Sequence, residues 1–322
     1  MANIMSNMSE VELDGTDRRI IAALQCDPRA TVEHLAGVLT LGTRPLRRRL
    51  NHLLDSGAVR VVARTPQPAR VALMLRIRIL SGRLEQLSRA LARRTDIAYI
   101  DASIGGDELA AVLITESDTA GRLITRQLPE TGAIAAVEAH PILHVFSEAK
   151  DWRLDALSDH ERSALTLPQH PRVEGQPVGE RDAAIIDALT LQPRASATWV
   201  ADRVQAPVST VRRRLTTLRN TGQLAYEVSV DPARLGLPID VNFWIRLPPQ
   251  HLDDVGRALA THPAVHGTLA LAGTFSLNVA AWFADLGALY HFMTTVLAEY
   301  PIDQIEPIIV GSAIKRPGRH AV

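Results

Sequence analysis

The chain has 322 residues, of which 46% are hydrophobic, and its 35 basic and 35 acidic side chains leave a formal net charge of zero at pH 7. This length is enough for two or more domains with separate cores, and the balanced charge excludes a polycation that coats nucleic acid without specificity. The chain has one cysteine, Cys26, which excludes an intrachain disulfide. It has no apolar run of about 18 residues, and residues 1–10 show no signal pattern. We therefore expect a soluble, cytoplasmic protein.

The sequence repeats itself at a constant offset. Residues 17–60 align without a gap on residues 182–225, and 15 of the 44 pairs are identical, which predicts a tandem duplication of class α+β. The expected organisation is a tail (1–13), a winged helix-turn-helix (14–65), a ferredoxin-like regulatory domain (70–150), a linker (151–178), a second winged helix-turn-helix (179–235) and a second regulatory domain (240–316).

The first repeat reads as three helices followed by a short strand. Thr31 is expected to cap the second helix, and Gly57 to end the third. Pro45 is tolerated only in a first turn, so the third helix should start at Thr43 or Arg44. Apolar residues at helical spacing predict the inward faces of these helices: Ile20, Ile21, Leu24, Val32, Leu35, Ala36, Leu39, Leu46, Leu50, Leu53 and Leu54.

The third helix of each repeat carries three consecutive arginines. At about 100° per residue, Arg44, Arg48 and Asn51 lie opposite the apolar stripe, Arg47 lies at the edge, and Arg49 flanks the core. A third helix of this kind enters the major groove of DNA, where arginine pairs with guanine or phosphate. The residues predicted to contact DNA are Arg44, Arg47, Arg48, Arg49 and Asn51 in the first repeat, and Ser209, Thr210, Arg212, Arg213, Arg214 and Thr216 in the second.

Each helix-turn-helix is followed by the order β-α-β-β-α-β, which predicts a ferredoxin-like domain. In the first half the strands are expected at 73–79, 97–104, 109–115 and 135–145, and the helices at 84–91 and 120–128. In the second half the strands are expected at 241–247, 265–271, 277–282 and 305–310, and the helices at 252–260 and 286–297. Residues 153–165 could form a short helix before the linker.

Taken together, Ile20–Ile21, Pro28–Arg29–Ala30, the arginine-rich third helix and the glycine-containing turn of the following domain resemble the Lrp/AsnC (feast/famine) transcriptional regulators. The resemblance covers each half in turn. It implies double-stranded promoter DNA as a partner, regulatory domains that pair through their sheets, and an amino acid or related effector bound near the turn between the second and third strands. It also implies an intrachain pseudo-dimer of 70–150 with 240–316, a homo-oligomer, and no membrane partner.

The effector turns differ between the two halves. The first contains Asp107 and Glu108, whereas the second has Phe275 and Ser276 at the matched positions, so we expect the two carboxylates of the first turn to hold an effector ammonium group. The residues implied as effector contacts are Gly105, Gly106, Asp107, Glu108, Gly273, Thr274, Phe275 and Ser276. The third helix of each repeat, which corresponds to the recognition helix of the family, also departs from the family pattern at its start. The first repeat has Gly42 there, and the second has Pro207.

The competing hypothesis is an enzyme on the same fold, because sirohaem decarboxylases, which act on a tetrapyrrole, resemble this family. That hypothesis requires basic and histidine residues lining the regulatory-domain cleft, together with decayed DNA-binding helices. The arginines are retained, so the sequence predicts a protein that is not an enzyme and has no cofactor. His140 and His144, like His262 and His266, are four residues apart but not on a predicted helix, so no metal site is predicted.

Overall fold

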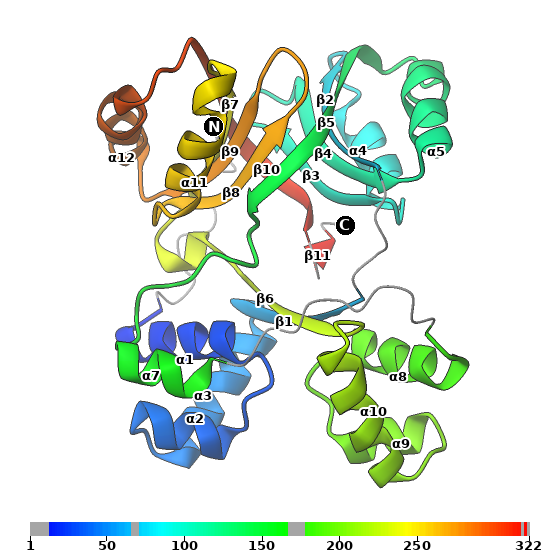
Figure 1. Cartoon of the computed structure of the whole chain (residues 1–322), viewed down its shortest axis with the longest axis vertical. Helices are drawn as coiled ribbons and strands as arrows, with labels where there is room; N and C mark the ends of the chain where they lie inside the picture. The colour runs from blue at the N-terminus through cyan, green and yellow to red at the C-terminus, as the bar shows by residue number, and fades with distance from the viewer. Residues whose placement is uncertain (1–12, 66–70, 167–177, 317–318, 321–322) are drawn as a thin grey trace. The chain divides into compact units, whose positions relative to one another are not determined.

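A computed structural model describes residues 13–65, 71–166, 178–316 and 319–320 (Figure 1). The chain divides into two compact units, one formed by Met1–Pro68 with Arg153–Arg234 and the other by Ala69–Trp152 with Leu235–Val322. We call them unit 1 and unit 2, and each combines a segment from each half of the sequence. The predicted tail, apart from Leu13, and residues 66–68 and 167–177 of the predicted links lie outside the described residues.

In the first half, unit 1 contains the three predicted helices. Helix α1 (Gly15–Cys26) starts with a capping box between Asp14 and Asp17, and Thr31 caps α2 (Val32–Leu39) as predicted. Helix α3 (Thr43–Asp55) begins at Thr43, with Gly42 as its N-cap. Most of the predicted inward residues are fully buried, which makes α3 one wall of a compact core: Ile20, Ile21, Leu24, Leu35, Leu39, Leu46, Leu50 and Leu53.

The second half repeats this arrangement with α8 (Glu180–Leu191), α9 (Ala197–Arg203) and α10 (Val208–Asn220). Among the residues that the structure describes, those with positive φ other than glycine are Thr40 and Gln205, at 54° and 50°, which occupy matched positions in the two turns. The left-handed conformation is uncommon outside glycine. Its occurrence at both positions therefore indicates one turn geometry in the two helix-turn-helix domains.

The two helix-turn-helix domains are joined by a two-stranded antiparallel ribbon. Strand β1 (Val59–Arg64) pairs with β6 (Ala225–Val230) over six residue pairs, and Ala63 of β1 packs into the core of the second domain. Part of the predicted linker also belongs to unit 1, because α7 (Asp159–Leu165) packs on α1 and Arg19 forms an ion pair with Glu161. Residues 153–165 are therefore a folded part of unit 1.

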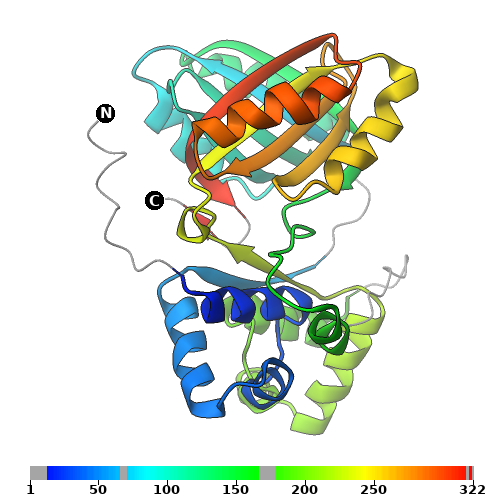
Figure 2. The same ribbon diagram turned by 90° about the vertical axis from the view of Figure 1, so that its left-hand side faces the viewer.

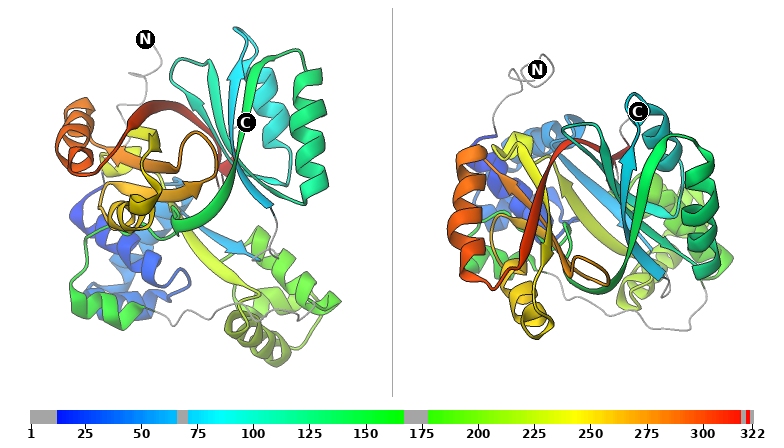
Figure 3. Two further views of the ribbon diagram at one scale, coloured as in Figure 1. Left: turned by 45° about the horizontal axis from the view of Figure 1, so that its top comes forward. Right: turned by 90° about the horizontal axis from the view of Figure 1, so that it is seen from above.

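Unit 2 contains one closed sheet, in which the strands expected for the two ferredoxin-like domains are joined edge to edge. The pairing order is β10-β3-β4-β2-β5-β8-β9-β7, and β7 pairs again with β10 to close the ring (Figure 3). The strands of the first half are β2 (Val71–Ile79), β3 (Ile97–Ser103), β4 (Glu108–Thr115) and β5 (Ile134–Ser147). Those of the second half are β7 (Ile239–Arg246), β8 (Val265–Leu271), β9 (Leu277–Phe283) and β10 (Gln304–Arg316), to which β11 (Arg319–His320) adds an edge.

Closure depends on two strands that are longer than predicted. The first part of β5 pairs with β2, and residues 142–147 continue onto β8 of the other half. In the same way, residues 304–309 of β10 pair with β7, and residues 310–315 of β10 continue onto β3. Each half therefore contributes one strand to the edge of the other, and the predicted pairing of 70–150 with 240–316 takes the form of continuous hydrogen-bonded strands.

Helices cover the outer face of this sheet in two places. Helices α4 (Leu84–Ala92) and α5 (Ser117–Arg122) pack on the first half, and α11 (Leu252–Ala260) and α12 (Leu286–His291) on the second. Both α5 and α12 continue as π-helical turns, at Leu123–Gln127 and Phe292–Val296, and end in the short helical segments α6 (Leu128–Glu130) and Leu297–Glu299. Among the described residues, no helix combines the length and the apolar character needed to cross a bilayer.

Candidate functional site

The outward face of α3 carries the arginines predicted to contact DNA. Leu46, Leu50 and Leu53 are at most 2% exposed, so the helix is held with one face against the core of its domain. The opposite face is open to solvent and contains four of the five predicted residues: Arg44, Arg47, Arg48 and Asn51. The local fold therefore places these side chains together, as the helical spacing predicted.

Helix α10 presents an outward face at the matched positions. Val211 and Leu218 are buried, and Ser209, Arg212, Arg213 and Thr216 are exposed, whereas Thr210 is half-buried beside them. In Figure 2, α3 and α10 lie on the two flanks of unit 1, with the β1–β6 ribbon between them. One unit therefore contains two exposed third helices.

The last arginine of each triplet has a different position. Arg49 Nη1 lies 2.8 Å from Asp14 Oδ2 and 2.9 Å from Asp17 Oδ1, at the start of α1. Arg214 pairs with Asp182 at 3.7 Å, and these two residues are the counterparts of Arg49 and Asp17. The pKa of Asp14 is lowered, first by the hydrogen bond from the backbone N–H of Asp17 and, against the opposing effect of burial, by Arg49.

These ion pairs concern two of the residues predicted to contact DNA, Arg49 and Arg214. The sequence predicts both as residues that flank the core, with Arg49 a flanking or phosphate contact, and in the structure their guanidinium groups pair with carboxylates of the same domain. Within the described part of the chain, Arg44, Arg48, Arg212 and Arg213 form no ion pair, and Arg47 pairs with exposed Glu33 at 3.0 Å. These four arginines are among the exposed cations of unit 1 that have no ion-pair partner in the described residues.

Unit 2 encloses a second set of polar side chains inside its sheet. Alternate residues of β2, such as Leu75 and Ile77, pack against the covering helices, so Met74 and Arg76 lie on the inner face. The middle of that face is apolar and is formed by Met74, Ala110, Trp244, Leu271 and Phe275. Polar networks flank this apolar layer.

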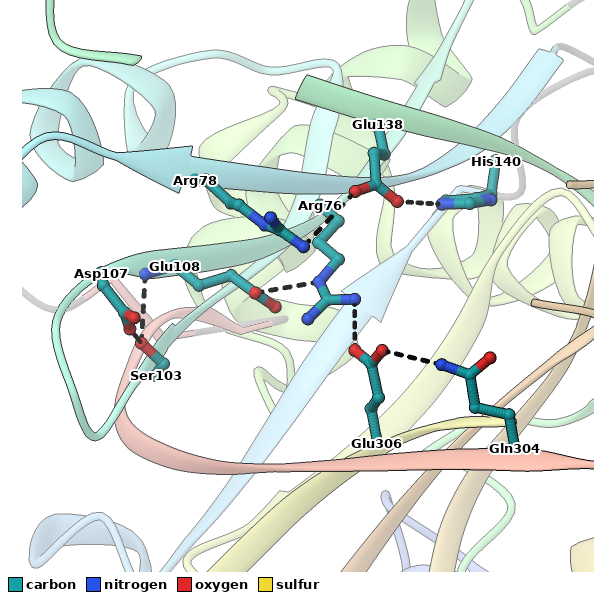
Figure 4. A network of polar contacts seen from close by, with 9 residues as sticks. All are labelled: Arg76, Arg78, Ser103, Asp107, Glu108, Glu138, His140, Gln304 and Glu306. Atoms are coloured by element: carbon teal, nitrogen blue, oxygen red, sulfur yellow. Dashed lines mark hydrogen bonds and ion pairs between the residues drawn. The ribbon is translucent and has the colours of Figure 1, made fainter. Parts of the chain in front are cut away.

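The first network is centred on Arg76 (Figure 4). Its side chain is 6% exposed, and its Nε lies 2.9 Å from Glu108 Oε2, while Nη1 lies 2.7 Å from Glu306 Oε2. The guanidinium group also lies over the Trp244 ring, 5.4 Å from the centroid. Burial raises the pKa of Glu108, and Arg76 opposes that shift. The network joins both halves of the chain, because Glu306 comes from β10.

The second network lies where β3, β7, β8 and β10 meet. Arg316 of β10 forms ion pairs with Asp101 and, at 3.2 Å, with Asp240, which in turn lies 3.2 Å from His266. Asn242 donates a hydrogen bond to Asp101 at 3.2 Å. Burial raises the pKa of Asp101 to about 6, although Arg316 opposes this effect and Asp240 adds to it. None of these residues was identified as a site residue from the sequence.

The structure separates the residues that were implied as effector contacts. Gly105 and Asp107 are exposed in the first turn, where the Ser103 hydroxyl donates to Asp107 Oδ1 at 2.8 Å, and Gly106 is half-buried beside them. Glu108, in contrast, faces inward to Arg76 and is 7% exposed. Because this carboxylate is already paired, the first turn offers an effector one open carboxylate, that of Asp107.

The second turn is closed over the inside of the sheet. Gly273 and Thr274 are exposed, but Phe275 is buried against Trp244, and Ser276 is occupied by hydrogen bonds with Leu247. Gly273 has a φ of 134°, and a Cβ there would lie 2.5 Å from His140 Nδ1. The second turn is therefore packed against β5 of the other half.

A small cavity opens between the two networks. It has a volume of about 10 Å³, and its walls include Asp101, Ser103, Glu108, Asn242 and Trp244. Glu108 Oε1 and Trp244 Nε1 are buried there without a hydrogen-bond partner in the described structure. The cavity volume is close to the least that holds one water molecule, so the cavity is far smaller than a pocket for a drug-sized ligand. No group of three or more potential metal ligands occurs among the described residues.

Three family profiles match parts of the chain. The AsnC-type helix-turn-helix domain matches residues 13–54, the Lrp/AsnC ligand binding domain matches residues 240–319, and the IclR helix-turn-helix domain matches residues 180–227. No curated protein matches the chain. Both third helices thus lie in segments with helix-turn-helix character, and a Lrp/AsnC ligand-binding domain is present in unit 2.

Solved structures resemble the chain at low sequence identity. The crystal structure of the siroheme decarboxylase NirDL has a TM-score of 0.60 at 13% identity and covers 94% of this chain and 93% of that chain, as does its complex with an iron-uroporphyrin III analogue. AsnC of E. coli has a TM-score of 0.41 at 18% identity and covers 46% of this chain and 99% of that chain. A Neisseria meningitidis regulator in complex with L-Met has a TM-score of 0.41 at 22% identity and covers 44% of this chain and 94% of that chain.

The comparison with NirDL corrects the expectation that this chain is not an enzyme. The structures that match nearly all of its length are those of a decarboxylase. The retained arginines were taken from the sequence as a reason against catalysis, but exposed arginines on unit 1 carry no information about chemistry in unit 2. At 13% identity the likeness shows a shared fold.

Proposed function

We propose that the chain is a sequence-specific DNA-binding regulator that responds to a small ligand. The observation that carries this proposal is the pair of exposed third helices, each with two arginines that have no ion-pair partner within the described residues. Guanidinium groups at these positions can pair with guanine edges or with phosphates. The profile matches at residues 13–54 and 180–227 support a helix-turn-helix in both places.

The proposal includes the organisation expected from the sequence. Each half contributes one DNA-binding domain, at 14–65 and 179–235, and one regulatory domain, at 70–150 and 240–316. Two or more such chains would then associate as dimers of this family do. The matched turns at Thr40 and Gln205 support two copies of one subunit.

The ligand in this proposal is an amino acid or a related metabolite. An ammonium group that leaves water at a binding site needs a charged partner. Asp107 supplies one from the first turn, whereas Thr274 and Ser276 of the second turn supply only neutral groups. We therefore propose that the first turn contributes more to ligand binding. Calorimetry with a panel of amino acids would test this: Asp107→Asn should weaken binding and Ser276→Ala should not.

DNA binding can be tested with fragments of genomic DNA and the purified chain. The fragments retained should bind with a dissociation constant that rises steeply with salt, because arginine contacts to phosphate release counterions. Arg48→Ala and Arg213→Ala should weaken retention, and the exposed Arg89→Ala on unit 2 is the matched control. Equal retention by all four proteins would remove the DNA assignment.

A second candidate function is decarboxylation of a tetrapyrrole, favoured by the fold match along nearly the whole chain. Each such step breaks a carbon–carbon bond, releases carbon dioxide and leaves a proton on the remaining carbon. Arg78 and Arg246 are exposed at matched positions of β2 and β7, where they could pair with substrate carboxylates. The interior cavity is too small for such a substrate, which would bind elsewhere on the unit.

This candidate is tested by mixing the chain with sirohaem. Decarboxylation would lower the mass of the tetrapyrrole by whole carboxyl groups, and binding alone would shift its absorbance spectrum. Arg78→Ala with Arg246→Ala should diminish both signals, with Arg89→Ala again as the control. If neither mass nor spectrum changes, the second candidate is wrong.

A further inference from the structure

The two exposed third helices of unit 1 differ at specific positions. Arg47 and Arg48 of α3 have arginine counterparts in α10, namely Arg212 and Arg213. Arg44, however, is matched by Ser209, and Asn51 by Thr216. All four of these differing side chains are exposed. The two outward faces therefore share a central arginine pair and differ on either side of it.

The two domains that carry these helices are locked to each other by a reciprocal contact. Arg29 donates from Nη1 to the Pro193 carbonyl at 2.7 Å and from Nη2 to the Ala195 carbonyl at 2.6 Å. Arg194, its counterpart, donates to the Pro28 carbonyl and, at 2.8 Å, to the Ala30 carbonyl. Together with the β1–β6 ribbon, these contacts hold α3 and α10 in one arrangement with approximate two-fold symmetry.

Helices related in this way present their faces to two successive sections of a duplex, as the subunits of a symmetric dimer present theirs to the two halves of a palindrome. The backbone symmetry is kept here, but the side chains break it. Arginine at position 44 can pair in bidentate fashion with guanine, and asparagine at position 51 with adenine. Serine and threonine at positions 209 and 216 are short and hydrogen-bond to either kind of base.

We propose that the DNA partner of this chain is an asymmetric site with two unlike half-sites. Arg44 and Asn51 specify the first half-site, Ser209 and Thr216 specify the second, and the shared arginine pairs read what the two have in common. This inference rests on the proposed DNA binding and adds the kind of site and the specificity residues. Because the halves differ, one chain binds its site in a single orientation and so distinguishes the two directions along the duplex.

Selection from a library of random duplexes by the full chain tests this inference. The expected result is a site whose two halves differ, bound about tenfold or more tightly than an inverted repeat of either half. An enriched palindrome would overturn the inference and leave the proposed function in place. If no duplex is enriched at all, both the inference and the proposed DNA binding fail.

A matched pair of variants tests the specificity residues. Ser209→Arg combined with Thr216→Asn gives α10 the outward residues of α3 at exposed positions, so the folded domain is retained. We expect this variant to prefer an inverted repeat of the first half-site. The control, Asn220→Asp, removes another difference between the helices at the last residue of α10, away from the end that meets the bases, and should leave the asymmetric site unchanged. If the double variant still selects two unlike halves, the assignment to Ser209 and Thr216 is wrong.

Discussion

Arg29 and Arg194, which occupy matched positions in the two halves, each donate hydrogen bonds to the backbone turn that contains the other. The Arg29 guanidinium group additionally donates to the Tyr226 hydroxyl at 3.0 Å and lies over the Tyr226 ring. Both residues therefore act inside unit 1, as contacts between its two helix-turn-helix domains.

Replacing Arg29 and Arg194 together should weaken DNA binding although neither residue lies on α3 or α10. Each single alanine variant leaves two carbonyls without a charged donor and should lower the free energy of unfolding of unit 1 by about 1–3 kcal/mol. The double variant should also lose the tight binding of two linked half-sites. Thermal unfolding and fluorescence anisotropy would measure the two effects. Tyr226→Phe, which keeps the ring, is the control; an unchanged affinity in the double variant would contradict the prediction.

Substituting two neighbouring arginines of α3 should affect two different quantities, DNA affinity for Arg48 and the free energy of unfolding for Arg49. Arg48→Ala removes an unpaired, exposed cation, so DNA affinity should fall by about 1–3 kcal/mol if it contacts a base, with no effect on stability. Arg49→Ala breaks the pairs with Asp14 and Asp17 and should lower the free energy of unfolding by up to about 1 kcal/mol. Denaturant titration and binding assays on both variants would show the contrast. Equal losses of affinity would mean that Arg49 also contacts DNA.

Gly273→Ala should destabilise unit 2. The new Cβ would lie 2.5 Å from His140 Nδ1, and the φ of 134° is unfavourable for any side chain. We expect a loss of more than about 1 kcal/mol from backbone strain alone. Gly106→Ala is the control for backbone strain without a clash, because Gly106 has a φ of 70° and the atom nearest to a Cβ there would be 3.6 Å away. Adding His140→Ala should relieve part of the Gly273→Ala loss, and additive effects in that double-mutant cycle would count against the contact.

Removing the guanidinium group of Arg76 should be among the most damaging changes in unit 2. Arg76→Met leaves Glu108 buried without its partner, and breaking a buried ion pair in this way costs about 3–5 kcal/mol. The double variant Arg76→Met with Glu108→Gln should recover part of that loss, because no buried charge remains unpaired. Arg78→Ala, on the same strand but exposed, should change the unfolding free energy by less than about 1 kcal/mol. Chemical denaturation would rank the three proteins.

Asp101 should make unit 2 less stable as the pH rises. Its pKa, about 6 in the folded chain, lies above the ordinary value of 3.8, chiefly because the group is buried. The folded state therefore binds this proton more tightly, so the stabilisation is complete below pH 3.8 and is lost as the pH rises through about 6. Burial also raises the pKa of Asp240, but His266 and Arg316 outweigh this effect, so the pKa lies below the ordinary value of 3.8. The ionised Asp240 therefore stabilises the fold above that value, and this contribution is lost as the pH falls below it.

The measurement is the difference in unfolding free energy between wild type and Asp101→Asn. As the pH rises from about 4 to 7, wild type should lose roughly 1–3 kcal/mol of unfolding free energy relative to the variant, as expected for a group whose pKa changes by a few units on folding. Asp107→Asn, on the exposed turn, is the control. A difference that stays constant with pH would show that Asp101 is ionised throughout this range.

Local patterns in the sequence predicted the elements well. Apolar alternation placed a strand at 73–79, inside β2, and the spacing of Leu252, Val255 and Leu259 predicted α11 with its observed bounds. Closure of the sheet could not be predicted in this way, because it depends on which strand ends meet in space. Alternation alone places Arg76 on the face of β2 that points away from the covering helices, and closure of the sheet buries that face.

One indication of a covered inner face lies in the second half. Trp244, at the position matched with Arg76, and Trp282 alternate with helix-facing residues, and the sequence predicts that both pack inward or at an interface. Large aromatic side chains on that face indicate that something covers it. The outward arginines of α3 and α10, in contrast, followed directly from helical periodicity, since each helix is anchored by one apolar stripe.

The exchange of β5 and β10 between the halves of unit 2 has a consequence for biosynthesis. The edge of β3, which ends at Ser103, is covered by β10, which starts only at Gln304 and is therefore synthesised much later. Until then the first half displays two open strand edges, of β3 and of the outer part of β5, and such edges readily pair with another chain. Two nascent chains on one messenger could therefore pair through these edges, and the single-chain barrel requires that each chain's own second half cover them.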